Sequence, residues 1–219
     1  MCIRDSLRID SGLALNRRHR FLKRSFDIVF SLVGLGATGW LILLAILASR
    51  HSTKKSGIFR QRRVGRHGSE FEIFKIRTMR DIPGVTTTVT ADGDPRITRL
   101  GRLLRKYKID ELPQLYNVLR GDMSFVGPRP DVAELVQSLK GADRIVLSVR
   151  PGITGPASIK YRNEEELLAV QSNPDAYNRS VIFPDKTRIN REYVERYRFA
   201  WDIQPVSYTH LTLPTICSV

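Results

Sequence analysis

Residues 99–131 read RLGRLLRKYKIDELPQLYNVLRGDMSFVGPRPD, and the rest of the chain is organised around this stretch. Leucines recur at helical spacing in its first part, with cationic side chains between them, which predicts a basic amphipathic helix. The adjacent acids Asp110 and Glu111 follow. An acid pair shortly before Pro113 is typical of a helix start, but so cationic a stretch also attracts phosphate. The spacing alone favours the first interpretation.

The composition indicates a partner with negative charge. The chain has 219 residues and a formal net charge of +14, which suits nucleic acid, an anionic membrane surface or phosphorylated substrates. Its length allows one domain, or one domain with a membrane element. The cysteines, Cys2 and Cys217, lie at opposite extremes of the chain. No disulfide framework is therefore expected, and a reducing compartment is the default.

An uncharged apolar stretch over residues 28–48 follows a basic cluster at residues 17–24. Its length suits a membrane segment, and a buried core helix is the alternative. Lysine and arginine are dense on both flanks, so the positive-inside rule places both ends on the cytoplasmic side. A re-entrant helix satisfies this rule and a straight span does not. Thr38-Gly39 near the centre would allow the necessary break.

Further elements are expected on both sides of the opening stretch. Alternating apolar residues and turn signals predict a β-hairpin over residues 57–79 with its turn at residues 66–69. Polar composition predicts a loop over residues 80–95. Helical patterns and Gly/Pro-rich segments predict the remainder: a loop at 124–130, a helix within 131–149, an irregular segment at 150–156, and helices at 164–170 and 190–201.

These elements define the expected fold class as α with a minor β component (α+β). It comprises an N-terminal re-entrant membrane helix, amphipathic interface helices and a small cytoplasmic globular domain with a short β-hairpin. Residues 1–6 and 206–219 resemble translated sequencing-adapter sequence and are excluded from this reasoning. The expected division is a basic segment with the membrane helix at 7–50 and a cytoplasmic globular domain at 51–205.

Several motifs occur in one order: KRSFDIVF, FRQRRVGRHGSEFEIFKIRTM, DELPQLYNVLRGDMSFVGPRP and VRPGITGP. In this order the chain resembles the bacterial sugar transferase family, the small monotopic phosphoglycosyl transferases, from about residue 20 to residue 203. The resemblance implies transfer of a sugar-1-phosphate from a UDP-sugar to polyprenyl phosphate, usually undecaprenyl phosphate, with release of UMP. It also implies the bacterial cytoplasmic (inner) membrane, a catalytic domain on the cytoplasmic face, and a role in exopolysaccharide or lipopolysaccharide synthesis.

The resemblance also assigns site residues. The acid dyad of the family falls on Asp110 and Glu111. Asp110 would be the nucleophile of a covalent phosphosugar–aspartyl intermediate, and Glu111 would orient the dyad or accept a proton. Mg²⁺ bound near Asp110 would neutralise the diphosphate. Cationic side chains are candidates for binding the substrate phosphates: Lys75, Arg77, Arg105 and Arg129.

Two departures from the family pattern qualify these expectations. Thr38-Gly39 stands where the family commonly has a Ser-Pro break, and Pro156-Ala157-Ser158 stands where relatives often have Trp-Ala-Gln. The identity of the sugar therefore does not transfer. Two other interpretations stay open: a non-catalytic basic protein anchored to a membrane, and an inactive, truncated family member. Nucleic acid is not an expected partner, because no nucleic-acid fold signature is present.

Overall fold

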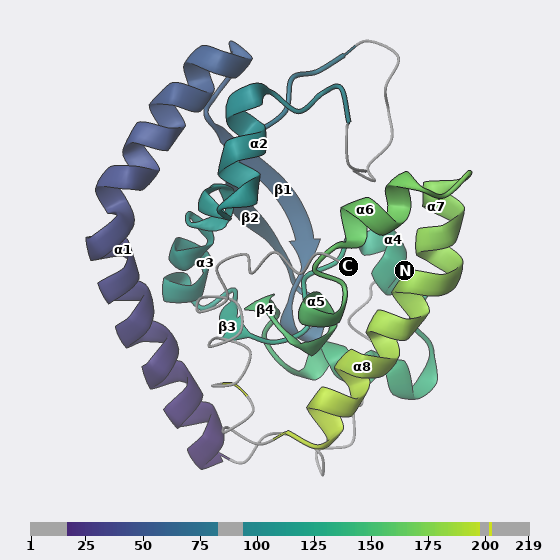
Figure 1. Cartoon of the computed structure of the whole chain (residues 1–219). Helices are drawn as coiled ribbons and strands as arrows, with labels where there is room; N and C mark the ends of the chain where they lie inside the picture. The colour runs from purple at the N-terminus through teal and green to yellow at the C-terminus, as the bar shows by residue number, and fades with distance from the viewer. Residues whose placement is uncertain (1–16, 83–93, 198–201, 203–219) are drawn as a thin grey trace, which may run out of the picture.

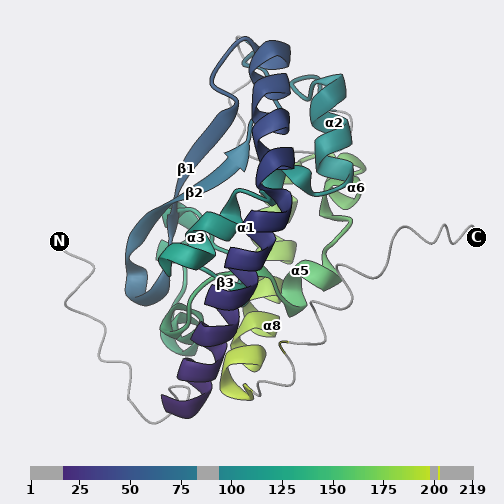
Figure 2. The same cartoon turned by 90° about the vertical axis from the view of Figure 1, so that its left-hand side faces the viewer.

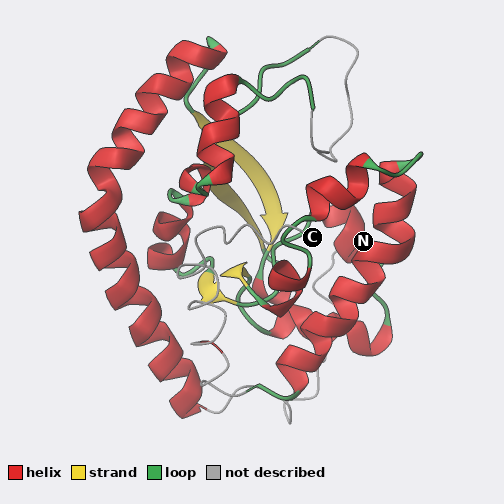
Figure 3. Cartoon of the chain, in the orientation of Figure 1, coloured by secondary structure: helices red, strands yellow, loops and turns green. Residues whose placement is uncertain are grey.

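The computed structural model describes residues 17–82, 94–197 and 202 of the chain. The described chain is mostly helical and contains two sheets of two strands each, which Figure 3 shows in the middle of the molecule. The expected α class with a minor β component is confirmed. The two adapter-like ends, 1–6 and 206–219, lie outside the described residues, as does most of the predicted loop over residues 80–95.

Helix α1, Arg17–Thr53, is a single helix of 37 residues, and Figure 1 shows it bowed along one side of the globular part. The break expected at Thr38-Gly39 is absent, since helical structure continues through both residues. The Thr38 hydroxyl donates to the Gly34 carbonyl at 2.7 Å, a bond that bends helices without interrupting them. Glycine permits a break but does not impose one.

In α1 the polar face lies inside and the apolar face lies outside, which is the reverse of a helix in a soluble protein. The face against the globular part carries polar or small residues that are less than 10% exposed, among them Asp27, Ser31 and Ser49. The outer face carries large apolar side chains that are more than half exposed, among them Val33 and Trp40. A helix of a soluble protein turns its apolar stripe toward the core, so this outer face is suited to lipid. Figure 2 shows α1 in front of the globular part.

The predicted hairpin is confirmed. Strands β1, Ile58–Val64, and β2, Glu70–Ile76, pair antiparallel. The turn between them, η2 at Arg66–Gly68, lies where the sequence predicts it. Figure 1 shows this hairpin between α1 and the helices of the C-terminal half. Its buried side packs into a cluster of Phe71, Ile73, Val118 and Met123.

Three short helical elements follow in the stretch that opened the sequence analysis. The predicted amphipathic helix is α2, Arg99–Lys106, and Thr98 caps it by accepting a hydrogen bond from the Gly101 amide. The 3₁₀ turn η3, Ile109–Glu111, comes next, and α3, Gln114–Arg120, begins after Pro113. Ile109 packs against a buried cluster from α1, β2 and α2. The acid pair is therefore held in a turn between α2 and α3, close to α1.

The expectation of irregular segments at 124–130 and 150–156 is wrong in part. Strands β3, Ser124–Val126, and β4, Gly152–Thr154, form a parallel pair. A Cβ atom on Gly152 would lie 2.2 Å from the Gly127 amide nitrogen, so only glycine allows the two backbones to approach. The glycines therefore serve close strand pairing and do not mark a loop.

The C-terminal half consists of short helices. They are α4, Ala133–Gln137; η4, Gly141–Ser148; α5, Pro156–Lys160; α6, Glu164–Ala169; α7, Pro174–Tyr177; η5, Asn178–Ile182; and α8, Phe183–Glu195. The helix at 164–170 is confirmed, whereas the one within 131–149 is divided between α4 and η4. Between these two elements Lys140 is extended, and Gly141 is left-handed with a φ of 51°, so they cannot form one regular helix. The last α-helix begins at Phe183 and not at residue 190. It continues directly from η5, since Ile182 already has helical φ and ψ angles.

Candidate active site

The turn η3 sets the direction of the acid pair. Lys108 has a φ of 55° and is left-handed, a conformation that costs a residue with a side chain about 1–2 kcal/mol. It ends α2 and turns the chain, so that Asp110 is 7% exposed. Strain of this kind is typical of functional sites. The local backbone therefore buries a carboxyl group that a regular helix end would leave in water.

Glu111 is held by two cations from distant parts of the chain. Lys75 of β2 donates to Glu111 Oε1 at 2.9 Å, and Arg129 of the loop after β3 donates to the same oxygen at 2.6 Å. Burial alone would raise the pKa of Glu111, but the charges of Arg129 and Lys75 hold that pKa well below its usual value. Burial lowers the pKa of Lys75, and the Glu111 charge opposes that effect. Glu111 is therefore a fixed anion.

Asp110 differs from its neighbour in both hydrogen bonding and charge. Its Oδ1 is buried and has no hydrogen-bond partner among the described residues. Burial and the negative charge of Glu111 raise the pKa of Asp110 to about 6. Lys75, Lys108 and Arg105 act in the opposite direction. Asp110 is therefore the acid with a free oxygen and the more basic carboxylate of the two.

The other predicted cations lie in different places. Arg105 of α2 is close enough to act electrostatically on Asp110, and its Nη1 lies 3.3 Å from Glu165 Oε1 of α6. Arg77 follows the end of β2, where its Nε donates to the Ser56 carbonyl at 2.8 Å. Its guanidinium stacks on the Phe59 ring, 5.5 Å from the centroid. The structure thus brings three of the four predicted cations toward the dyad. Arg77 instead lies at the open end of the hairpin, opposite the turn.

Two residues of the site were missed from the sequence. Lys108 lowers the pKa of both acids by its charge, and its position next to the dyad could have suggested this. Asn117 is fully buried, and its amide bonds the backbone of Phe74 and Glu72 at 3.1 and 2.7 Å. It fastens α3 to β2 and so fixes the dyad relative to Lys75. Its partners lie more than 40 residues away in sequence, so no local pattern identifies them.

The residues present fit a magnesium ion that is shared with a substrate. No cluster of three or more His, Cys, Asp or Glu side chains suited to a metal occurs in the part of the chain that the structure describes. Mg²⁺ commonly takes only one or two protein carboxylates together with substrate phosphates. The unpartnered oxygen of Asp110 is a suitable donor for such a site.

Comparison with known proteins identifies related sequences. The family model described as bacterial sugar transferase matches residues 18–215. The uncharacterized sugar transferase EpsL of Bacillus subtilis is 42% identical over 188 residues, covering 86% of this chain and 85% of the relative. The undecaprenyl-phosphate galactose phosphotransferase of Salmonella typhimurium is 39% identical over 175 residues, covering 72% and 36%. The UDP-glucose:undecaprenyl-phosphate glucose-1-phosphate transferase of Caulobacter vibrioides is 42% identical over 144 residues, covering 63% and 53%.

Proposed function

Since the chain belongs to the bacterial sugar transferase family, we propose that it transfers a sugar-1-phosphate from a UDP-sugar to undecaprenyl phosphate and releases UMP. Relatives named for this reaction support the proposal. The observation that carries it is the buried, unpartnered oxygen of Asp110 beside the ion-paired Glu111. The names of the relatives differ in the sugar, galactose or glucose, so the donor is left as a UDP-hexose.

In the first step, Asp110 attacks the phosphorus that carries the sugar. A bond forms between this phosphorus and a carboxylate oxygen, the bond to the bridging oxygen breaks, and its electron pair leaves with UMP. A pKa of about 6 keeps Asp110 ionised at neutral pH and makes it a stronger nucleophile than an ordinary aspartate. Glu111 is unsuited to this role, because its Oε1 is bound to Lys75 and Arg129. It positions these two cations.

In the second step, an oxygen of the lipid phosphate attacks the same phosphorus. The bond to the Asp110 oxygen breaks, which restores the carboxylate and gives the undecaprenyl diphosphate sugar. Two displacements at phosphorus each require charge neutralisation around the transferred group. Lys75, Arg105 and Arg129 supply it from three elements of the fold. Mg²⁺, when bound, adds further neutralisation, and Asp110 is the carboxylate that would hold it.

The contacts of α1 support a position in one leaflet of the membrane. Near its start, Arg24 donates to the Val118 and Leu119 carbonyls at 2.6 and 2.7 Å. Near its end, the Ser49 hydroxyl donates to the Arg77 carbonyl at 2.5 Å. Both ends are therefore fixed to the same globular part, which a helix crossing the bilayer does not allow. Basic flanks on both sides support a position of that part on the cytoplasmic face.

Other exposed apolar side chains extend this surface. Leu103 of α2, Tyr107 directly after α2, and Tyr116 of α3 are each at least half exposed. Figure 2 shows both helices beside α1. Together with the outer face of α1 they form an apolar surface bordered by the cations of α2. A surface of this kind lies at the headgroup boundary. The dyad, one turn beyond α2, then lies near the depth of a lipid phosphate.

The reaction is tested with membranes from cells that express the chain. They are incubated with a panel of UDP-sugars, Mg²⁺ and undecaprenyl phosphate, and UMP is measured. UMP release with at least one sugar is expected, and Asp110→Asn should reduce it by at least about 10³-fold. Asp143→Asn is the matched control, because Asp143 pairs with Arg191 on the surface. Release that persists in Asp110→Asn would contradict the assignment, and no release with any sugar would favour a non-catalytic protein.

The topology is tested by thiol labelling. Cysteines replace Arg18 and His51 in a chain whose Cys2 and Cys217 are changed to serine. Both positions are exposed on the molecule, so the membrane alone decides the labelling in intact spheroplasts. Protection of both from an impermeant reagent is expected. Labelling of one position only would show a full span.

A further inference from the structure

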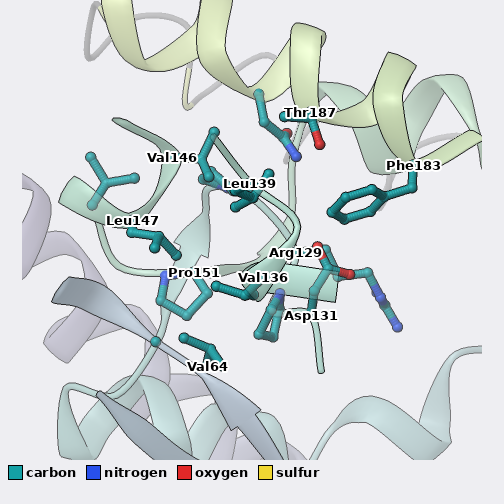
Figure 4. A pocket seen from close by; sticks show the side chains of 15 residues that line it. Val64, Arg129, Asp131, Val136, Leu139, Val146, Leu147, Pro151, Phe183 and Thr187 are labelled. Atoms are coloured by element: carbon teal, nitrogen blue, oxygen red, sulfur yellow. The ribbon is translucent and has the colours of Figure 1, made fainter. Parts of the chain in front are cut away.

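A pocket opens behind the loop that carries Arg129. It lies between this loop, the elements α4 and η4, and helix α8. Figure 4 shows Phe183 and Thr187 of α8 on one side and Arg129 with Asp131 on another. Apart from Asn190, the remaining wall is apolar and includes Leu139. The pocket therefore combines an aromatic ring, an apolar wall and a few polar groups, as small-molecule sites do.

One polar side chain that lines this pocket has an unmet hydrogen bond. Asn190 is 8% exposed, and its Oδ1 is buried without a partner among the described residues. Asn190 follows Phe183 and Thr187 at spacings of seven and three residues, which places all three on one face of α8. A buried, unpaired amide destabilises a fold. Its presence in a pocket therefore indicates a ligand with polar groups.

The pocket and the dyad share one residue. Arg129 lines the pocket, and its Nη2 reaches Glu111 Oε1 at 2.6 Å. A substrate whose diphosphate lies at the dyad can therefore extend its nucleoside past Arg129 into the pocket. The pocket offers a planar apolar ring for stacking and a carboxamide for hydrogen bonding. These are the two groups with which proteins bind a nucleobase outside a duplex.

We propose that this pocket binds the uracil base of the UDP-sugar, with the base against Phe183 and its imide edge on the Asn190 amide. The proposal rests on the function proposed above and adds where the base of the UDP-sugar binds. Uracil presents an N–H donor beside carbonyl acceptors, and a carboxamide presents a complementary acceptor and donor. Asn190 and Phe183 thereby set the preference for a uridine nucleotide, whereas the dyad acts on the sugar phosphate.

The test compares UMP with ribose 5-phosphate, which lacks the base. Their affinities for the full chain in detergent are measured by calorimetry, without lipid or turnover. The wild-type chain is expected to bind UMP about 30-fold more tightly, by stacking and base hydrogen bonds. Asn190→Leu and Asn190→Ala should reduce this ratio about tenfold by loss of the hydrogen-bonded edge. Asn178→Ala is the control, because Asn178 lies on η5 and does not line the pocket.

A second measurement separates binding from folding. Asn190→Leu removes an unpaired polar group, so its melting temperature without ligand should equal or exceed that of the wild type. The increase in melting temperature on adding UMP should be largely lost. A residue that only supports the fold would show the reverse pattern, with lower stability and an unchanged response to UMP, and this would overturn the proposal.

Other outcomes also decide the matter. A UMP to ribose 5-phosphate ratio that both variants leave within about twofold of the wild type would overturn base recognition. So would a wild-type chain that binds UMP no better than ribose 5-phosphate. Unchanged UMP affinity with altered discrimination between UDP-glucose and UDP-galactose would assign the pocket to the hexose instead. Intact UMP binding without UMP release would contradict the proposed reaction and leave the base pocket standing.

Discussion

Asp110 and Asp202 are both buried carboxylates, but their surroundings differ. Asp202 accepts hydrogen bonds on both oxygens, from Lys23 at 2.5 Å, Tyr193 at 2.5 Å and Tyr197 at 2.6 Å. Asp110 keeps one oxygen without a partner among the described residues, and burial and the charge of Glu111 raise its pKa to about 6. Asp202 is therefore a complete centre, a carboxylate with hydrogen-bond donors on both oxygens. Asp110 is an open centre, a carboxylate with one oxygen free for a ligand.

In the proposed reaction, this difference separates a carboxylate that stabilises the fold from the carboxylate that acts as nucleophile. Asp202 joins the C-terminal part of the chain to α1 through Lys23, so its bonds hold two distant segments together. The open oxygen of Asp110 costs stability, because a buried acceptor loses water without gaining a donor. Such a cost is retained where chemistry requires it. Changes at the open centre should therefore alter activity, and changes at the complete centre should alter stability.

After the loss expected for Asp110→Asn, the largest expected effect comes from Arg129→Ala. This change removes one of the two cations paired with Glu111, and in the proposed reaction that guanidinium neutralises the transferred phosphate, so kcat/KM for the UDP-sugar should fall about 10²–10³-fold. Initial rates of UMP release at several donor concentrations measure the loss. Arg120→Ala is the control, because Arg120 pairs only with its neighbour Asp122 among the described salt bridges. A loss of less than about fivefold would remove Arg129 from the reaction.

Asp202→Ala should act on stability. The change leaves the Lys23 ammonium and two tyrosine hydroxyls without their acceptor, which costs about 2–4 kcal/mol. The unfolding midpoint in detergent, followed by circular dichroism, should fall by roughly 5–10 °C. The kcat of the folded protein should change less than about threefold. A large loss of kcat with an unchanged midpoint would mean that Asp202 is not a structural group.

The pH dependence should report Asp110. In the proposed reaction the carboxylate is the reactive form, and its pKa in the free protein is about 6. The value of kcat/KM, which reports ionisation of the free enzyme, should therefore be level above about pH 7 and fall by about tenfold per pH unit below about pH 5. The protonated form is the more stable one in the fold. Stability relative to Asp110→Asn should therefore decline as pH rises from about 4 to about 6. A kcat/KM that stays level down to pH 5 would contradict the raised pKa.

The smallest effect is expected for Arg77→Gln. The guanidinium of Arg77 bonds the Ser56 carbonyl and stacks on Phe59, away from Glu111. UMP release should change less than about threefold, although the sequence makes Arg77 as good a candidate as Lys75. Parallel measurement of Lys75→Gln gives the contrast. Equal losses in the two variants would mean that Arg77 moves to the substrate during the reaction.

Local patterns in the sequence predicted the local elements. The apolar stretch at 28–48, the hairpin with its turn, and the amphipathic run at 99–107 each carry their own periodicity, and the structure confirms all three elements. The parallel pair β3–β4 was missed, because its partners are 28 residues apart and three residues long. Their glycines indicate a loop until the close approach of the two backbones is known.

For the site, too, the sequence predicted which residues take part but not the contacts between distant segments. The resemblance to a family supplied the dyad, and the chemistry of phosphate binding supplied the candidate cations. Residue types alone made Lys75 and Arg77 equivalent. They differ because β2 ends at Ile76, so Lys75 stays in the sheet and reaches Glu111, whereas Arg77 turns away. The contrast between Asp110 and Glu111 depends on burial and on partners from two other elements. No spacing in the sequence contains that information.

Trapping of the intermediate tests the central claim most directly. The purified chain is incubated with a UDP-sugar and Mg²⁺ in the absence of lipid phosphate, quenched, and analysed by mass spectrometry of the intact protein and its peptides. The account predicts added mass equal to one sugar phosphate, located on Asp110. The adduct should be absent from Asp110→Asn and should disappear when undecaprenyl phosphate is added. An adduct on Glu111, or lipid-dependent UMP release without any adduct, would contradict it.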